Sequence, residues 1–332
     1  MLNTVNLFIA LVVAAITYGT PLLFGTLGEV LTEKSGSLNL GVEGIMFMGG
    51  AIGLGGVFYY EKAVESPSAF LAVLIGLLCA FIAGGIASLI FSFLTITLRA
   101  NQNVTGLALT IFGTGVGQYI GEIMRIREGG FVAVGNDLKA VFISSPFPQA
   151  MQDIPYVGKI LFGNSIFFYL GVVLAIVMHL FLNKSRTGLQ LRSVGESPAT
   201  ADAAGINVTK YKYLATCIGS MIAGLGGLYY VMDYASGVWS NNAFGDRGWL
   251  AIALVIFTIW RSNVGVFASI LFGGLYILHM YIPTGSNPAV KELYKMLPYI
   301  VTIVVLCISS LRKKREDQPP QHLGLPYFRE ER

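Results

Sequence analysis

The sequence predicts an all-α, polytopic membrane protein. Apolar residues make up 54% of its 332 residues, charged residues only 12%, and the mean hydropathy is +0.67. Soluble domains carry about 25% charged residues. Two runs, residues 1–28 and 66–98, contain no Asp, Glu, Lys or Arg, and each exceeds the roughly 20 apolar residues that cross the hydrocarbon core as a helix. The first run has no basic leader and no obvious cleavage site, which indicates a retained span rather than a signal peptide.

Apolar windows predict nine spans, or ten if an irregular region adds a short or re-entrant helix. The first and third spans are the two charge-free runs. The second is interrupted by glycines, and the loop 128–163 is the other place for a tenth helix. The fourth begins in a polar cluster, the fifth and sixth flank a polar stretch, and the last ends at a basic cluster. The windows are 5–28, 40–60, 68–98, 104–124, 165–183, 211–232, 248–260, 264–282 and 296–311.

The chain contains 40 glycines, more than the roughly 7% of average usage. Helices in lipid associate through close van der Waals packing, which small residues allow. Gly113, Gly117 and Gly121 are spaced four residues apart and therefore share one helix face. We expect this face to lie against a neighbouring helix.

The polar stretch 184–212 contains a predicted docking helix. Ser197 suits the N-cap, Pro198 the first helical position, and Gly205 the left-handed turn that ends a helix. Two turns remain, roughly 10 Å of rod at 1.5 Å per residue. A short rod between long apolar spans is expected to be bound by something outside the bilayer.

Basic residues predict the orientation. If the C-terminus is cytoplasmic, 14 of the 22 Lys and Arg residues fall on the cytoplasmic side, as the positive-inside rule requires. The N-terminus is then outside, and the stretch 184–212 is cytoplasmic. The same rule accounts for the basic residues without a nucleic-acid partner. Residues 1–312 form the predicted membrane domain, and residues 313–332, rich in Pro, Gln and charge, a cytoplasmic polar tail with little structure.

Several polar groups lie at the ends of spans. Glu43 is expected within about one turn of the cytoplasmic interface, where a cap or interhelical hydrogen bond is favoured over a role in a gate. Asn101, Asn103 and Thr105 begin the fourth span. Their amides and hydroxyls suit a neutral polyol or heterocycle. They also suit hydrogen bonds between helices, which is the favoured role for any one of them.

The sequence lacks familiar catalytic motifs. Its three histidines show no paired spacing, and it has no GxxxxGK[ST], HExxH or GxSxG. The chain therefore has no phosphate loop of its own with which to hydrolyse a nucleotide. Uphill transport would take its energy from a partner or from an ion gradient.

Three segments, residues 31–46, 100–109 and 195–206, resemble the permease subunits of binding-protein-dependent ABC importers. The resemblance is to the branch for simple sugars, nucleosides and branched-chain amino acids, and within it to the shorter of two nucleoside permeases that work as a pair. It covers nearly all of the first 312 residues. Ser197 stands where that family commonly has Asn, and Ser is an equally good cap.

The resemblance implies a mechanism and its partners. Two permease chains, this one paired with a related chain or a second copy, would enclose the path. An external binding protein would deliver the nucleoside or sugar, and cytoplasmic ATPase subunits would bind ATP and Mg, with no cofactor on this chain. The setting would be a bacterial plasma membrane. The expected coupling residues are Glu196, Ser197, Pro198, Ala201, Asp202, Ala204 and Gly205, and the expected path or gate residues are Asn39, Glu43, Asn101, Asn103 and Thr105.

Other readings stay open. The same kind of permease for simple sugars such as ribose or galactose is the alternative for the substrate. An ion-coupled secondary carrier would need a buried acidic residue near the midplane and usually inverted repeats, whereas Glu43 and Glu122 lie near predicted span ends. A membrane scaffold that transports nothing is the third hypothesis, and it does not explain why the chain would have a docking helix.

Overall fold

The computed structural model describes residues 2–241, 244, 247–281, 288–312 and 318–330. Within these ranges the chain forms helices and connecting loops, and no strand is present apart from one isolated bridge between Ala133 and Val238. The all-α prediction is confirmed for the described part of the chain.

Six helical stretches are long and apolar enough to cross a membrane, as judged over the described residues. The helices that contain them are α1 (Leu2–Lys34), α2 (Val42–Ala63), α3 (Ala69–Ser92) with the π-helical turn Phe93–Thr97, α8 (Ile166–Lys184), α11 (Val208–Tyr229) with the π-helical turn Tyr230–Tyr234, and α13 (Ser262–Tyr281).

Three further helices occupy the remaining predicted windows. They are α4 (Gln102–Arg127), α12 (Arg247–Phe257) and α15 (Leu297–Arg312). Of these, α12 has 11 residues and α15 has 16, fewer than the roughly 20 that a full crossing takes. Each predicted window therefore holds a helix, but nine or ten complete crossings remain a prediction. The shorter helices are α5 (Asn136–Ile143), α6 (Gln149–Gln152), α7 (Gly158–Phe162), α9 (Arg186–Glu196), α10 (Pro198–Ala203) and α14 (Pro288–Lys295).

The bundle is built around α1 and α2. Helix α1 packs against α11 and α13, and α2 packs against α3, α4 and α11. A Cβ on Gly113 of α4 would lie only 2.6 Å from the backbone of Gly44 on α2, and Gly117 and Gly121 face Phe47 and Trp239 on the same side. The predicted glycine face is therefore a contact face, where the two backbones approach closely.

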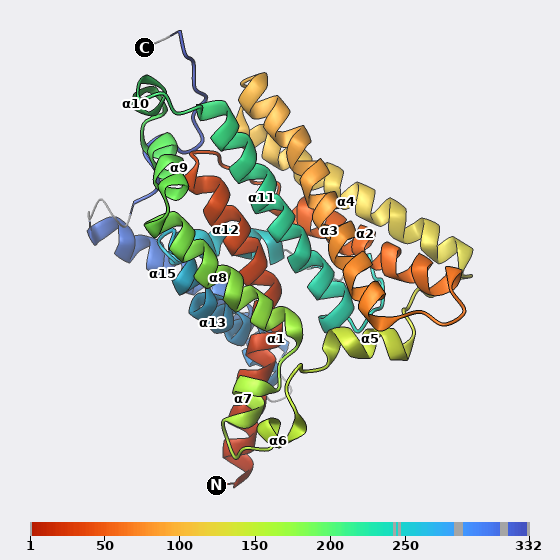
Figure 1. Ribbon diagram of the computed structural model, residues 1–332. Helices are drawn as coiled ribbons and strands as arrows, with labels where there is room; N and C mark the ends of the chain where they lie inside the picture. The colour runs from red at the N-terminus through yellow and green to blue at the C-terminus, as the bar shows by residue number, and fades with distance from the viewer. Residues whose placement is uncertain (1, 242–243, 245–246, 282–287, 313–317, 331–332) are drawn as a thin grey trace.

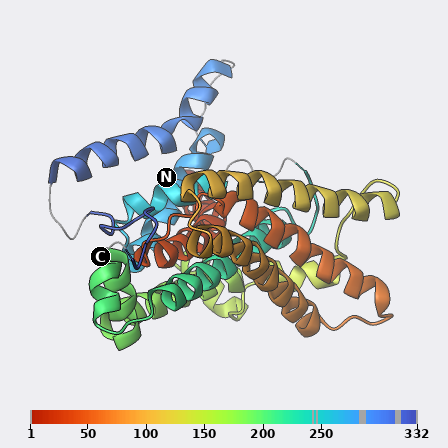
Figure 2. The same ribbon diagram turned by 90° about the horizontal axis from the view of Figure 1, so that it is seen from above.

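The two ends of the described chain lie at opposite ends of the bundle (Figure 1). Helices α9 and α10 and the C-terminal residues share one end, which we call the α10 end. The N-terminus and α5 to α7 lie at the other. Viewed from above, α15 lies at the edge of the bundle (Figure 2), where it contacts α12, α13 and α14.

Residues 318–330, for which the sequence predicts a solvated end with little structure, form turns but no helix, and they fold back onto the α10 end. Pro320 is buried, the backbone N–H of His322 donates to the carbonyl of Gly195 at 3.0 Å, and that of Gly324 donates to the carbonyl of Gly36 at 3.2 Å. Composition alone could not predict this, because the partners are backbone groups far away in the sequence. Residues 313–317 and 331–332 of the predicted tail lie outside the described residues.

Candidate functional site

Helix α10 forms where the sequence predicts the docking helix. Ser197 is its N-cap, with the hydroxyl accepting from the N–H of Thr200 at 3.4 Å, and Pro198 holds the first helical position. At the other end Gly205 has φ +82°, and the N–H groups of Gly205 and Ile206 donate to the carbonyls of Asp202 (2.9 Å) and Ala201 (3.0 Å). This is a Schellman ending, in which a left-handed glycine satisfies the last carbonyls.

The two faces of α10 differ. Pro198 and Ala201 are buried, and Ala201 packs with Val194 of α9 and Val208 of α11. The exposed residues are Ala199, Thr200, Ala203, Ala204 and Gly205. Small exposed side chains on a short, capped helix make a surface that a groove in another protein can receive without displacing long side chains.

The predicted coupling residues thus fall into three groups. Ser197, Pro198 and Ala201 build the helix from within, and Ala204 and Gly205 are exposed at its end. Glu196 and Asp202 instead bind the C-terminal residues: Glu196 accepts from the N–H of Gln321 at 3.3 Å, and Asp202 accepts from the hydroxyl of Tyr327 at 2.9 Å.

A second polar region lies inside the bundle, where α2 and α12 begin. Val42 and Ala251 both approach Gly25 of α1, which precedes Lys34 by nine residues, or about 13 Å along a helix. Both N-termini are therefore well below the end of α1. Helices that start at depth present free N–H groups and the positive ends of their dipoles to the interior.

Glu43 serves both of these N-termini. It lies in the first turn of α2 and is only 7% exposed, and its carboxylate accepts a hydrogen bond from the N–H of Gly248 in the first turn of α12. A negative charge at a helix N-terminus is favourable, and here one carboxylate faces two such termini. The structure thus places Glu43 in an interhelical hydrogen bond, the role that the sequence favoured.

The loop 35–41 connects α1 to this interior region. Asn39 is fully buried, its N–H donates to the Glu29 carboxylate at 3.0 Å, and its side-chain oxygen accepts from Gly41 at 2.9 Å. The amide nitrogen of the Asn39 side chain is buried and has no hydrogen-bond partner. The loop is also held to α4, because Gln102 accepts from the N–H of Leu38 at 2.7 Å.

Three buried charged residues of this region were not among the predicted site residues. Glu29 and Glu33 on α1 are 1% and 2% exposed, and Glu33 accepts from the indole of Trp260 at 2.5 Å. Arg247 is 5% exposed and donates to the carbonyl of Phe244 at 2.6 Å. Glu29 and Arg247 lie one position outside an apolar window and Glu33 lies five positions outside. A search for buried polar residues within the windows therefore does not find them.

Four tyrosines surround the guanidinium of Arg247. The distances from its central carbon to the ring centres run from 4.4 Å to 6.0 Å, which is within cation–π range, and the rings are those of Tyr18, Tyr230, Tyr234 and Tyr276. The faces of aromatic rings attract a buried guanidinium electrostatically.

The predicted path residues at the start of α4 differ in how far they are buried. Asn101 caps α4, accepting from the N–H of Val104 at 3.1 Å, and both Asn101 and Asn103 are exposed. Thr105 is buried and donates to the carbonyl of Asn101 at 2.8 Å. These two contacts are local to the start of α4, so only Asn39 and Glu43 belong to the interior region.

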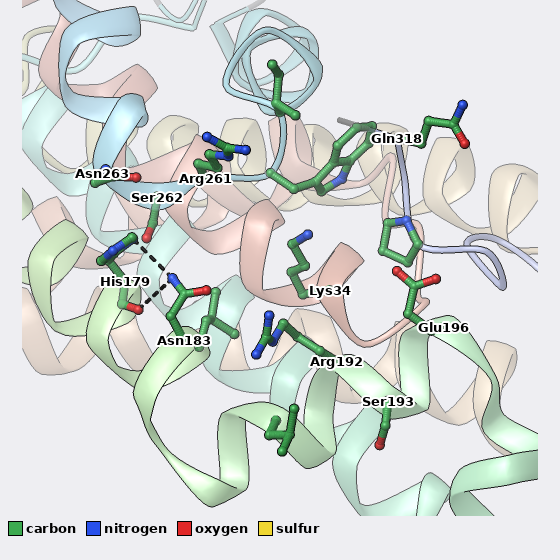
Figure 3. A pocket seen from close by; sticks show the side chains of 15 residues that line it. Lys34, His179, Asn183, Arg192, Ser193, Glu196, Arg261, Ser262, Asn263 and Gln318 are labelled. Carbon is green, nitrogen blue, oxygen red and sulfur yellow. Dashed lines mark hydrogen bonds between the residues drawn. The ribbon is translucent and has the colours of Figure 1, made fainter. Parts of the chain in front are cut away.

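A cavity of about 640 Å³ opens at the α10 end beside these elements. Lys34, Arg192 and Arg261 approach it from α1, α9 and the start of α13, with Glu196 at one side (Figure 3). His179 and Asn183 of α8 line the opposite wall, where their side chains are joined by a hydrogen bond of 3.2 Å. Basic residues from distant parts of the sequence therefore gather at this end of the bundle.

The architecture found here, a bundle of membrane helices with a short exposed helix between α8 and α11, agrees with a family comparison. Residues 11–306 match the family described as branched-chain amino acid transport system / permease component. The chain belongs to this family. It is accordingly a multi-pass membrane protein of the ABC permease class, whose members are transport components.

Relatives match along nearly their whole lengths. The chain is 31% identical to the nucleoside ABC transporter permease protein NupC of Lactococcus lactis, covering 92% of this chain and 94% of the relative. It is 31% identical to the putative glucose ABC transporter permease protein TsgC13 of Haloferax volcanii (90% and 91%) and 30% identical to the guanosine ABC transporter permease protein NupQ of Bacillus subtilis (100% and 100%). No solved structure gives a significant match.

Weaker matches come from two of the same organisms. The chain is 24% identical to the guanosine ABC transporter permease protein NupP of Bacillus subtilis over 88% of its own length. It is 26% identical to the nucleoside ABC transporter permease protein NupB of Lactococcus lactis over 42% of its own length. Each organism thus has two permeases, both similar to this chain, whose names share one substrate class.

Proposed function

We propose that this chain is the membrane-spanning permease subunit of an ABC importer for nucleosides, driven by ATP hydrolysis in partner subunits. The observation that carries the proposal is α10, a capped helix with an exposed face of small residues between two membrane-spanning helices. Full-length similarity to permeases named for nucleosides and for guanosine supports the substrate.

The proposed orientation puts the α10 end in the cytoplasm and the N-terminus outside, in a bacterial plasma membrane. Lys34, Arg192 and Arg261 gather at the α10 end, and an excess of basic residues marks the cytoplasmic side. The helices in the nine predicted windows would then each count as a crossing. Residues 1–312 would be the permease domain, and residues 184–212 its cytoplasmic coupling region.

The proposed complex contains ATPase subunits that bind ATP and Mg, an external binding protein, and a second permease. The occurrence of related permease pairs under one substrate name favours a heterodimer over two copies of this chain. Asn39, Glu43, Asn101, Asn103 and Thr105 remain proposed path or gate residues. Asn39 and Glu43 are the stronger candidates, because they lie beside the N-termini of α2 and α12.

Transport by the reconstituted complex tests the substrate. Proteoliposomes that contain both permeases, the ATPase subunits and the matched binding protein are expected to take up radiolabelled inosine. This uptake should require ATP on the side of the membrane where the ATPase subunits lie. Adenosine and guanosine should compete, and ribose, galactose and glucose should not. Competition by the sugars alone would favour a sugar permease, for which the similarity to TsgC13 is the specific support. Uptake that requires a proton gradient and no ATP would favour a secondary carrier.

Accessibility of α10 tests its side and its partner. Ala199→Cys and Ala203→Cys place thiols on the exposed face, and Ala201→Cys, at a position that is 2% exposed, is the matched control. In right-side-out vesicles, the two exposed thiols should react with a membrane-impermeant maleimide only after permeabilisation and should crosslink to the ATPase subunit. Reaction of intact vesicles would contradict the orientation. Absence of crosslinks in a complex that transports would contradict the coupling role.

A further inference from the structure

We propose that residues 318–330, here called the C-terminal segment, position α10 relative to the loop 35–41, and that Tyr327 is a positioning residue for energy coupling. This inference rests on the proposed function, because it assigns a task within the coupling step. It is carried by a set of contacts that join α10, the loop 35–41, α9 and α4 through one short stretch of chain.

The contacts with α10 converge on Asp202. The Tyr327 hydroxyl donates to its Oδ2 at 2.9 Å, and Arg329 Nε lies 3.2 Å from the same oxygen. The Tyr327 ring also packs against the apolar cluster of Val194, Ala201 and Val208. Because the Arg329 side chain is 73% exposed, its ion pair is screened by water and contributes little. The partly buried Tyr327 is therefore the main attachment.

The same segment is attached to the end of α1 and the loop that follows. The N–H of Gly324 donates to the carbonyl of Gly36, and the N–H of His322 donates to the carbonyl of Gly195, the next-to-last residue of α9. Gly36 has φ +82°, and a Cβ there would lie 3.2 Å from the Cα of Gly195 and 3.3 Å from the carbonyl oxygen of His322. A side chain on Gly36 would therefore be strained by its backbone conformation and crowded by both neighbours.

A third attachment reaches the start of α4. The side-chain nitrogen of Gln102 donates to the carbonyl of Leu325 at 3.5 Å, while its oxygen accepts from the N–H of Leu38. One side chain therefore joins the segment to the loop. The guanidinium of Arg99 lies 4.7 Å from the ring centre of Phe328, a cation–π contact just before α4.

These attachments give the motion of α10 a route into the bundle. Along the chain α10 is joined only to α9 and α11. The C-terminal segment adds a connection from Asp202 to the loop 35–41, which ends next to Glu43 at the N-terminus of α2. Ala203 and Ala204 stay exposed, so an ATPase subunit can bind α10 while the segment is in place. Rigid elements of this kind convert a push at one site into a movement at another.

The ratio of ATP hydrolysed to solute transported tests this role, because a merely structural contact would change both rates together. Tyr327→Phe keeps the ring and removes the hydroxyl, and Glu330→Gln, an exposed position in the same segment, is the matched control. In the full complex in proteoliposomes we expect Tyr327→Phe to raise the ratio about fivefold, the factor that corresponds to losing one ordinary hydrogen bond of about 1 kcal/mol. Glu330→Gln should leave the ratio unchanged.

A double-mutant comparison addresses the contact itself. In an Asp202→Ala background, which removes the acceptor, Tyr327→Phe should have a much smaller effect than it has alone, because the two groups act through one hydrogen bond. Removal of residues 318–332 should raise the ratio at least as much as Tyr327→Phe. Unchanged ratios in Tyr327→Phe and in the truncation, or fully additive effects in the double variant, would overturn the proposal.

The role of the C-terminal segment and the proposed substrate can each fail without the other. The ratio is measured with whichever solute the wild-type complex transports, and co-purification with the ATPase subunits is measured for every variant. If inosine is not transported but a sugar is, the substrate assignment fails, and the ratio still decides the role of the segment. If the truncation does not assemble, the two point variants decide it.

Discussion

The α10 end and the interior region around Glu43 are both polar, but they are built in opposite ways. The α10 end is made by adjacent residues: Ser197, Pro198 and Gly205 begin and end a helix within nine positions. The interior region is made by residues far apart in the sequence, since Glu43 bonds to Gly248 and Glu33 to Trp260. Residues within a few positions of each other therefore suffice to predict α10, whereas the interior region depends on long-range contacts.

The largest effect is expected from Glu43. Glu43→Ala would leave the N–H of Gly248 buried without its partner, a loss of about 1–3 kcal/mol or more for a charged group, in a region that two helices share. We expect loss of most transport and lower thermal stability in detergent, with ATPase co-purification retained. Glu43→Gln keeps an acceptor and should retain part of both. Wild-type transport by Glu43→Ala would show that this bond is dispensable, and the interior region would lose its candidate role.

The glycine face of α4 should come next. A Cβ on Gly113 would lie 2.6 Å from the Gly44 backbone, whereas a Cβ on Gly115 would meet nothing within 4 Å. Gly113→Ala should lower the free energy of unfolding by about 1–3 kcal/mol through overpacking, and Gly115→Ala is the matched control on the same helix. Chemical unfolding in detergent compares them. Equal stabilities would mean that α2 and α4 do not approach as closely as described.

The N-cap of α10 should have a more modest effect. Ser197→Ala removes the acceptor for the Thr200 N–H and should cost about 0.5–2 kcal/mol of local helix stability. Because the helix is only six residues long, this loss should appear as weaker association with the ATPase subunits, measured by co-purification or surface binding. Ser197→Asn preserves a cap and should behave as wild type. A Ser197→Asn variant as weak as Ser197→Ala would contradict a capping role.

The same contrast explains what the sequence could predict. The all-α class, the helical windows and α10 follow from hydropathy and from residues within one or two turns of each other. The fold-back of residues 318–330 did not follow, because its hydrogen bonds use the backbones of Gly36, Gly195 and His322. The burial of Glu29 and Arg247 was not predicted, because each residue lies one position beyond a charge-free window, where a charge is expected to face water. Their burial depends on which helices begin nearby, and that is a tertiary property.

The smallest effect is expected from pH, through His322 in the C-terminal segment. Burial and then the nearby Lys212 ammonium lower the pKa of this imidazole, while Glu196 lies near it through its contact with Gln321. A lowered pKa means that the docked segment favours the neutral ring, so the docked state binds fewer protons than a released one. Docking should be strongest above the ordinary histidine pKa of about 6.5 and should weaken as pH falls below it.

Hydrogen–deuterium exchange measures this dependence. After correction for intrinsic exchange rates, amides in residues 318–330 should lose protection as pH falls below about 6.5, the ordinary histidine pKa. His322→Gln cannot gain this charge and should keep the same protection across the range. Helix α9, which contacts the segment but carries no histidine, is the internal reference. Loss of protection in His322→Gln as steep as in the wild type would show that His322 is not the group responsible.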